Sequence, residues 1–249
     1  MGMASTLPEM AEALVASSSA AERGLIPRVL QPALQWWLSS QLEQATGLEI
    51  EIQGGDRQLL RGYLPHVRVA AAKASYRGIQ LRQAAVQAEQ IQINLGQVLR
   101  GKPLKLLAPV PLRGELVLSQ DDLNASLGAP LLQSGLGELL KLLHQRGLGK
   151  AGVDLQEWQL LQTQGELGPG CLKLIFSMVN AQGEQVDWPL MTHVRLQDER
   201  TLCLEKVHWQ GERDIHPTVT IDLGDGVALQ ELRLEAAALR VQGMICIYP

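Results

Sequence analysis

The sequence predicts an α+β protein in which a long, curved antiparallel sheet wraps around amphipathic helices and encloses an elongated apolar trough. Three observations support this fold class. Apolar and polar residues alternate along residues 64–95, apolar residues recur at helical spacing within 25–46 and 130–146, and alternating segments separated by glycine-containing turns fill 151–249. Alternation with a period of two is typical of strands with one apolar face, whereas a period of 3.6 is typical of amphipathic helices.

The N-terminal part is expected to contain a mobile tail at residues 1–24, which are rich in Ala, Ser and acidic residues, followed by a helix at 25–46. Gly47 is a suitable C-terminal stop. The regular helix should begin at Pro32, because a proline inside a helix costs about 3 kcal/mol. Residues 25–249 are expected to form a single domain.

Two adjacent tryptophans lie within this predicted helix. Trp36 and Trp37 differ by about 100° around a helix, so they cannot face the same way. Trp37 is expected in the core. Trp36 either covers the rim of the core or lies at a membrane interface, where tryptophan is favoured.

Residues 47–118 are expected to form a β unit organised around one hairpin. Leu48 to Gln53 alternate cleanly and predict a strand. In the hairpin, Val67 and Val69 belong to the first strand, and Gly78 turns the chain into the second. Shorter elements are expected at 58–61 (the start of a strand), at 95–100 (one helical turn), and at 104–108 and 114–118 (two strands around a corner at 109–111).

Residues 119–147 are expected to be helical. Ser119 and Asp122 resemble a capping box, which predicts a short helix through Leu127. A second helix is expected to begin near Pro130, with one stripe of leucines at helical spacing.

The remainder, residues 151–249, is expected to be a β meander. Glycine-containing turns at 168–170, 181–183 and 224–226 divide it into alternating segments of strand length.

Composition and charge argue against several classes of protein. A net charge of −4 and a pI of about 5.8 give no general attraction to nucleic acid. Cys171, Cys203 and Cys246 are far apart and odd in number, which indicates reduced thiols rather than a disulfide framework or a zinc site. No segment reaches the ~18 apolar residues of a membrane span. The N-terminal residues lack the pattern of a secretory signal, which favours a cytoplasmic location, in solution or peripheral to a membrane.

No motif predicts catalysis, a cofactor or a metal. The G-x-G-x-x-G sequence at 147–152 follows a predicted helix and precedes a predicted strand, the reverse of the order in a dinucleotide site. The five histidines lack metal-binding spacing, and no G-x-S-x-G nucleophile elbow is present. We therefore expect a binding protein rather than an enzyme.

Basic residues are concentrated between residues 57 and 113, where acidic residues are sparse. Near strand ends such cations can meet lipid phosphates, each contributing roughly 1 kcal/mol at an anionic surface. Elsewhere they are equally well explained as solvated residues that protect strand edges. The residues expected to contact a headgroup or a membrane are Arg57, Arg61, Arg100, Lys102 and Trp36.

Several short motifs together resemble a known family. They are Leu60-Arg61-Gly62, Gly78 followed by alternating apolar residues, Ile91-Gln92-Ile93-Asn94, Gly101-Lys102-Pro103-Leu104 and, most strongly, the run from Gly114 to Leu127. In these motifs the sequence resembles the bacterial LmeA-like phospholipid-binding family. Leu239 to Met244 also resembles the strand that closes the fold in this family.

The resemblance implies a β-rich fold with an apolar groove, broadly like tubular lipid-binding proteins, and no catalytic residues. It implies phospholipid binding, with lipid transfer at a membrane surface as a possible extension. The aliphatic composition agrees, because Phe occurs once and Tyr three times. The trough residues expected to bind acyl chains are Leu34, Trp37, Leu38, Ile50, Ile52, Val67, Val69, Ile79, Leu81, Ile91, Ile93, Leu116, Leu118, Leu136 and Leu140.

The alternative is a protein-interaction or assembly factor whose trough is filled by its own side chains. In that case an exposed sheet edge or Trp36 would dock a protein partner. An open trough favours the lipid hypothesis, whereas a packed interior with an apolar outer patch favours the protein partner.

Overall fold

A computed structural model describes residues 42–98, 100, 102–150, 157–212 and 218–249. The predicted tail and residues 25–41 of the predicted first helix lie outside this range, together with four predicted site residues: Leu34, Trp36, Trp37 and Leu38. The described part is mostly antiparallel sheet with few helices, which confirms the predicted dominance of antiparallel strands. The predicted single sheet is replaced by three sheets.

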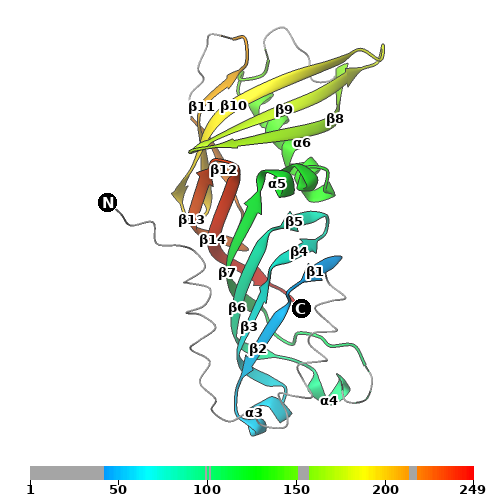
Figure 1. Cartoon of the computed structure of the whole chain (residues 1–249), viewed down its shortest axis with the longest axis vertical. Helices are drawn as coiled ribbons and strands as arrows, with labels where there is room; N and C mark the ends of the chain where they lie inside the picture. The colour runs from blue at the N-terminus through cyan, green and yellow to red at the C-terminus, as the bar shows by residue number, and fades with distance from the viewer. Residues whose placement is uncertain (1–41, 99, 101, 151–156, 213–217) are drawn as a thin grey trace, which may run out of the picture.

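The six-stranded sheet runs along the lower part of the molecule, ordered β13-β14-β7-β6-β3-β2 (Figure 1). All its neighbouring strands are antiparallel. Its strands are β2 (Glu49–Gln53), β3 (Tyr63–Ala71), β6 (Gln83–Gln92), β7 (Val110–Ser119), β13 (Val227–Glu235) and β14 (Ala238–Ile247).

The central hairpin is confirmed, but it contributes to two sheets. Its base is formed by β3 and β6, whereas its tip is formed by β4 (Lys73–Tyr76) and β5 (Ile79–Leu81). Arg77 and Gly78 form the two-residue turn, both with positive φ (50° and 80°). A turn with both central residues in the left-handed region matches the twist of the two strands.

The last residues of the predicted first helix are a strand instead. β1 (Gln44–Thr46) pairs with β4 and completes a three-stranded sheet ordered β1-β4-β5. The preceding Glu43 fixes this arrangement, because its carboxylate accepts hydrogen bonds from Ser75 Oγ (2.8 Å) and Gly78 N (3.2 Å). These partners lie more than 30 residues away, so helical spacing alone did not predict the pairing.

Residues 58–61 were also predicted wrongly, because they belong to a short helix and the turn after it. Helix α3 (Asp56–Leu60) follows Gly55, whose N–H donates to Gln58 Oε1 at 3.3 Å. This bond satisfies one of the free N–H groups at the helix start. The single helical turn predicted at 95–100 is confirmed as α4 (Leu95–Val98).

The strand predicted at 104–108 is reduced to one isolated bridge, between Leu106 and Ile93. The predicted corner at 109–111 is instead the beginning of β7. Pro111 is tolerated there because β6 pairs with β7 only as far as Leu112, so the proline needs no donor on that side.

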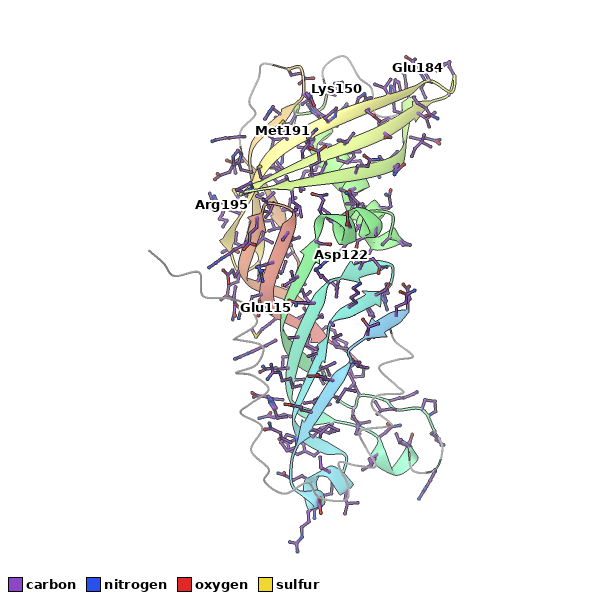
Figure 2. All side chains as sticks on the ribbon, in the orientation of Figure 1. Glu115, Asp122, Lys150, Glu184, Met191 and Arg195 are labelled. Atoms are coloured by element: carbon purple, nitrogen blue, oxygen red, sulfur yellow. The ribbon has the colours of Figure 1, made fainter. Side chains whose placement is uncertain are left out.

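The capping box is confirmed at the start of α5 (Gln120–Ser126). Asp122 N donates to Ser119 Oγ at 3.2 Å, and Ser119 N donates to the Asp122 carboxylate at 2.9 Å. Figure 2 shows Asp122 at the junction between the sheets. Helix α6 (Pro130–Gln145) confirms the second predicted helix.

The five-stranded sheet is an up-and-down meander, ordered β12-β11-β10-β9-β8. Its strands are β8 (Trp158–Gly168), β9 (Cys171–Asn180), β10 (Gln185–Asp198), β11 (Thr201–Trp209) and β12 (Val219–Asp222). The predicted meander was wrong for its last two strands. β13 and β14 leave it and pair with β7 in the six-stranded sheet.

Hydrogen bonds from α5 join the sheets. Gln120 Oε1 accepts from Leu167 N (2.7 Å) and Asn124 Oδ1 accepts from Gly165 N (2.7 Å), both on β8. On the other side of α5, Ser126 Oγ accepts from Gln80 N (2.8 Å), on β5. One short helix therefore contacts the five-stranded and three-stranded sheets directly after leaving β7.

The described residues form two separate hydrophobic cores. The upper core, between α6 and the five-stranded sheet, is centred on Phe176, Trp188 and Trp209, each at most 2% exposed. The lower core lies at the far end of the six-stranded sheet and has no aromatic residue. Its buried residues are Ile50, Leu59, Leu64, Val67, Ala88, Ile91, Ile93, Leu95, Leu104 and Val110.

Candidate functional site

Aliphatic side chains cover one side of the six-stranded sheet, which is termed here the aliphatic face. Alternate residues along a strand share a face, and directly paired residues on neighbouring strands share it too. By strand pairing its members are Ile50, Ile52, Val67, Val69, Ala71, Ala84, Val86, Ala88, Val110, Leu112, Gly114, Leu116, Leu118, Val227, Leu229, Leu232, Leu234, Leu239, Val241, Gly243, Ile245 and Ile247.

This face crosses all six strands without a polar or aromatic interruption. One row, for example, passes from β2 to β13 through residues paired in register: Ile52, Val67, Ala88, Leu112, Ile245 and Val227. In the described chain the aromatic residues are instead concentrated in the upper core, which contains Phe176, Trp188 and Trp209. The two halves therefore differ: the upper core contains three buried aromatic rings, whereas the face of the six-stranded sheet is entirely aliphatic.

The aliphatic face is only partly covered. On β7, β14 and β13 its buried members are Val110, Leu118 and Leu234, whereas Ile245 and Ile247 are 48% and 37% exposed. Toward β2 and β3 the face merges with the lower core, where Ile50 and Val67 are buried. A closed core would bury all of these side chains, so within the described residues the β7–β14–β13 side is a partly exposed apolar surface.

A pair of glycines lies at the centre of this face. Gly114 on β7 pairs directly with Gly243 on β14. A Cβ at position 243 would lie 2.5 Å from the carbonyl oxygen of Ala228 and 2.9 Å from Leu229 Cα. Because Gly243 has no side chain, β13 and β14 can approach closely beside the break in their register. The two glycines also leave a shallow depression in the middle of the aliphatic face.

Gly243→Val should destabilise the fold by about 3 kcal/mol, because its Cβ would meet backbone atoms that cannot rotate away. Urea unfolding followed by circular dichroism measures this change. Gly226→Val is the matched control, since a Cβ at that position would meet no atom within 4 Å beyond its chain neighbours. Equal stability of the two variants would contradict the close approach at Gly243.

The opposite side of the same sheet is polar. A cavity of about 400 Å³ on this side is lined chiefly by charged residues, and Glu115 marks its position in Figure 2. Two ion pairs, Arg233–Glu231 and Arg240–Glu235, lie in it. Neutralised, solvated charges of this kind do not suit an acyl chain, so this cavity is not the candidate site.

The structure divides the predicted trough residues into several groups. Ile50, Ile52, Val67, Val69, Leu116 and Leu118 lie on the aliphatic face. Ile91 and Ile93 lie in the adjoining lower core. Two others, Ile79 and Leu81, are on β5 in the three-stranded sheet, and Leu136 and Leu140 belong to α6 and the upper core.

The predicted cations lie together at the lower end of the molecule, where Figure 1 shows α3 and α4. Arg61 and Arg100 line one cavity of about 360 Å³ with Leu107 and the buried Ile93 and Leu95. Arg57 is exposed on α3, and Lys102 is exposed after α4.

Sequence reasoning missed the β13 and β14 members of the aliphatic face. Leu239, Val241, Gly243 and Ile245 alternate clearly, so the strand itself was predicted. However, alternation within a strand does not predict which other strand pairs with it. These residues were therefore assigned to the meander rather than to the trough.

In the described chain, the ionisable groups with shifted pKa values are at the surface, and hydrogen bonds cause the shifts. The pKa of Asp198 is lowered because the backbone N–H of Arg200 donates to its carboxylate at 2.9 Å. The pKa of Arg195 is raised by its hydrogen bond to Glu205, and that of Tyr248 by its hydrogen bond to Cys246. Within the described ranges, His, Cys, Asp and Glu side chains form no group of three that could hold a metal ion.

Comparison with known protein families identifies the family to which this chain belongs. A family model described as LmeA-like phospholipid-binding matches residues 21–244. The chain belongs to this family. No curated protein and no solved structure gives a significant match. For this LmeA-like chain, the family points to phospholipid as the ligand class. In the described part of the LmeA-like chain, no helix has the length and apolarity needed to cross a bilayer.

Proposed function

We propose that this LmeA-like protein binds phospholipid by laying the acyl chains on the aliphatic face of the six-stranded sheet, and that it transfers lipid at a membrane surface. The observation that carries the proposal is the partly exposed aliphatic surface that the described residues form on β7, β14 and β13, which adjoins the lower core. Membership of the phospholipid-binding family supports the choice of ligand.

The driving force would be the hydrophobic effect. Burying roughly 300 Å² of acyl surface at ~25 cal/mol per Å² contributes about 7 kcal/mol, which corresponds to affinity near the micromolar range. Aliphatic side chains suit this role because their surface is irregular and imposes no ring geometry on the chain. Gly114 and Gly243 add a low point at which an acyl chain approaches the backbone.

The proposal assigns binding rather than catalysis to the aliphatic face. It needs no nucleophile, acid or base, because the lipid would be held by desolvation of its acyl chains. The headgroup would remain near the exposed cations Arg61 and Arg100, beside the lower core.

Native mass spectrometry of the purified full-length chain tests this proposal. We expect a mass increment of one phospholipid per chain, identified by solvent extraction. After delipidation, incubation with phospholipid vesicles should restore the increment. A bare-chain mass that persists after this incubation would contradict lipid binding.

A second candidate function, docking of a protein partner, is favoured by one observation. The upper half fills its own core, and its surface includes exposed apolar side chains at Leu131 (64%), Leu161 (52%) and Met191 (37%). Figure 2 shows Met191 on β10. Because these side chains are scattered over α6, β8 and β10, they form a weaker case than the aliphatic face.

A further inference from the structure

The lower end of the molecule combines exposed cations with exposed leucines. This end, termed here the basic tip, comprises α3 with the following Arg61, α4, Arg100 and residues 102–108, at the end of the six-stranded sheet farthest from the five-stranded sheet (Figure 1). Its basic residues, all exposed, are Arg57, Arg61, Arg100, Lys102 and Lys105. Leu60 and Leu107 are also exposed, by 58% and 59%.

The charges of the basic tip are not neutralised by the chain. Residues 56–113 contain ten basic and two acidic residues, whereas the rest of the sequence contains twelve basic and 24 acidic residues. The ion pairs among the described residues use cations beyond residue 157, such as Lys173 and Arg240. The side chains of the five tip cations therefore face solvent without an ion-pair partner in the described chain.

We propose that the basic tip docks the protein onto an anionic lipid bilayer, with its cations at the phosphates and Leu60 and Leu107 inserted among the headgroups. Charge complementarity selects this occupant. Unpaired cations are attracted to an anionic leaflet, and the net negative charge of the rest of the chain turns that end away from it. Exposed leucines beside the cations add apolar contact with the bilayer.

Docking at this end also joins the membrane to the acyl-chain site. The cavity between Arg61 and Arg100 is lined by Ile93 and Leu95, which are 2% and 3% exposed and belong to the lower core. That core in turn continues into the aliphatic face through Ile50 and Val67. This inference rests on the proposed function, because the tip would be the entrance for the lipid that the face binds.

Flotation with phospholipid vesicles tests the docking directly. The full-length protein should bind vesicles of phosphatidylcholine and phosphatidylglycerol at a ratio of about two to one, and it should bind pure phosphatidylcholine vesicles much more weakly. Raising the salt concentration to about 0.5 M should release it, because exposed charges are then screened.

Two tip variants and two matched controls locate the contact. Arg57→Gln/Lys105→Gln, which removes two exposed tip cations that do not line the headgroup cavity, should weaken binding to anionic vesicles about 30-fold, and Leu60→Ser/Leu107→Ser roughly tenfold. The controls, which should bind like the wild type, are Lys141→Gln/Arg146→Gln, two exposed cations at α6, and Leu131→Ser/Leu161→Ser, two exposed leucines elsewhere.

The outcomes separate docking from lipid binding. Tip variants that keep their bound phospholipid in native mass spectrometry but lose vesicle binding would support the inference. Wild-type binding that is equal on both vesicle types, or equal losses in tip and control variants, would overturn it. Loss of the phospholipid increment from the wild type itself would instead contradict the proposed function.

Discussion

Ile245→Asp should reduce phospholipid binding by more than 100-fold while leaving the fold intact. Ile245 lies on the aliphatic face, pairs with Leu112 and Val227, and is 48% exposed. In the free protein the aspartate remains hydrated. Under an acyl chain it would lose water without gaining a partner, and burial of an unpaired carboxylate costs several kcal/mol. The bound phospholipid per chain, measured by native mass spectrometry, should fall accordingly.

The matched control for this prediction is Leu161→Asp. Leu161 is a strand residue of similar exposure (52%), but it lies on β8 in the five-stranded sheet. Both variants lose the strand preference of a bulky apolar residue, so their stabilities should change alike by about 1 kcal/mol. If Leu161→Asp removes lipid as effectively as Ile245→Asp, the acyl chains do not lie on the aliphatic face.

Trp209→Ala should destabilise the upper half by about 3–5 kcal/mol. The Trp209 side chain is 1% exposed, its ring centroid lies 6.2 Å from that of Phe176, and its Nε1–H donates to the carbonyl oxygen of Leu148 at 3.0 Å. The alanine variant would leave a large cavity and a buried carbonyl without its donor. Urea unfolding followed by far-ultraviolet circular dichroism measures the loss.

Trp209→Phe makes this prediction measurable even if the alanine variant does not fold. Phenylalanine keeps most of the ring volume but lacks the N–H group, so a smaller loss of about 1–2 kcal/mol is expected. A change below about 1 kcal/mol for Trp209→Ala would show that the upper core is not closely packed. The contrast with Ile245 follows from burial: one residue holds the scaffold together, and the other lies on a surface left open.

Local patterns predicted the elements whose cause is local. The capping box at Ser119 and Asp122 and the alternation of β2, β6 and β14 needed only neighbouring residues. β1 was missed because its structure depends on Glu43 reaching Ser75 and on pairing with β4. The short helix α3 was missed because a brief apolar run does not distinguish a strand from a single helical turn.

The candidate site was predictable only in part, for a related reason. Sequence identified apolar residues and cations, but the assignment of strands to sheets depends on pairing between distant segments. The grouping of Arg61 with Arg100 arose because α3 and α4 meet at the same end of the sheet. In contrast, Leu136 and Leu140 were placed in the same trough as Ile50, although α6 packs on a different sheet.

The half-covered aliphatic face has a consequence for the energetics of the whole protein. The six-stranded sheet buries less of its own apolar surface than a closed core does, so a bound lipid would supply the missing contacts. A ligand that binds only the native state stabilises it by RT ln(1 + [L]/Kd), about 2.7 kcal/mol at a hundredfold excess over Kd. The concentration of available lipid would then determine the fraction of protein that is folded as well as the fraction that has lipid bound. When the membrane contains little of this lipid, the unliganded protein would unfold more often and would have a shorter lifetime.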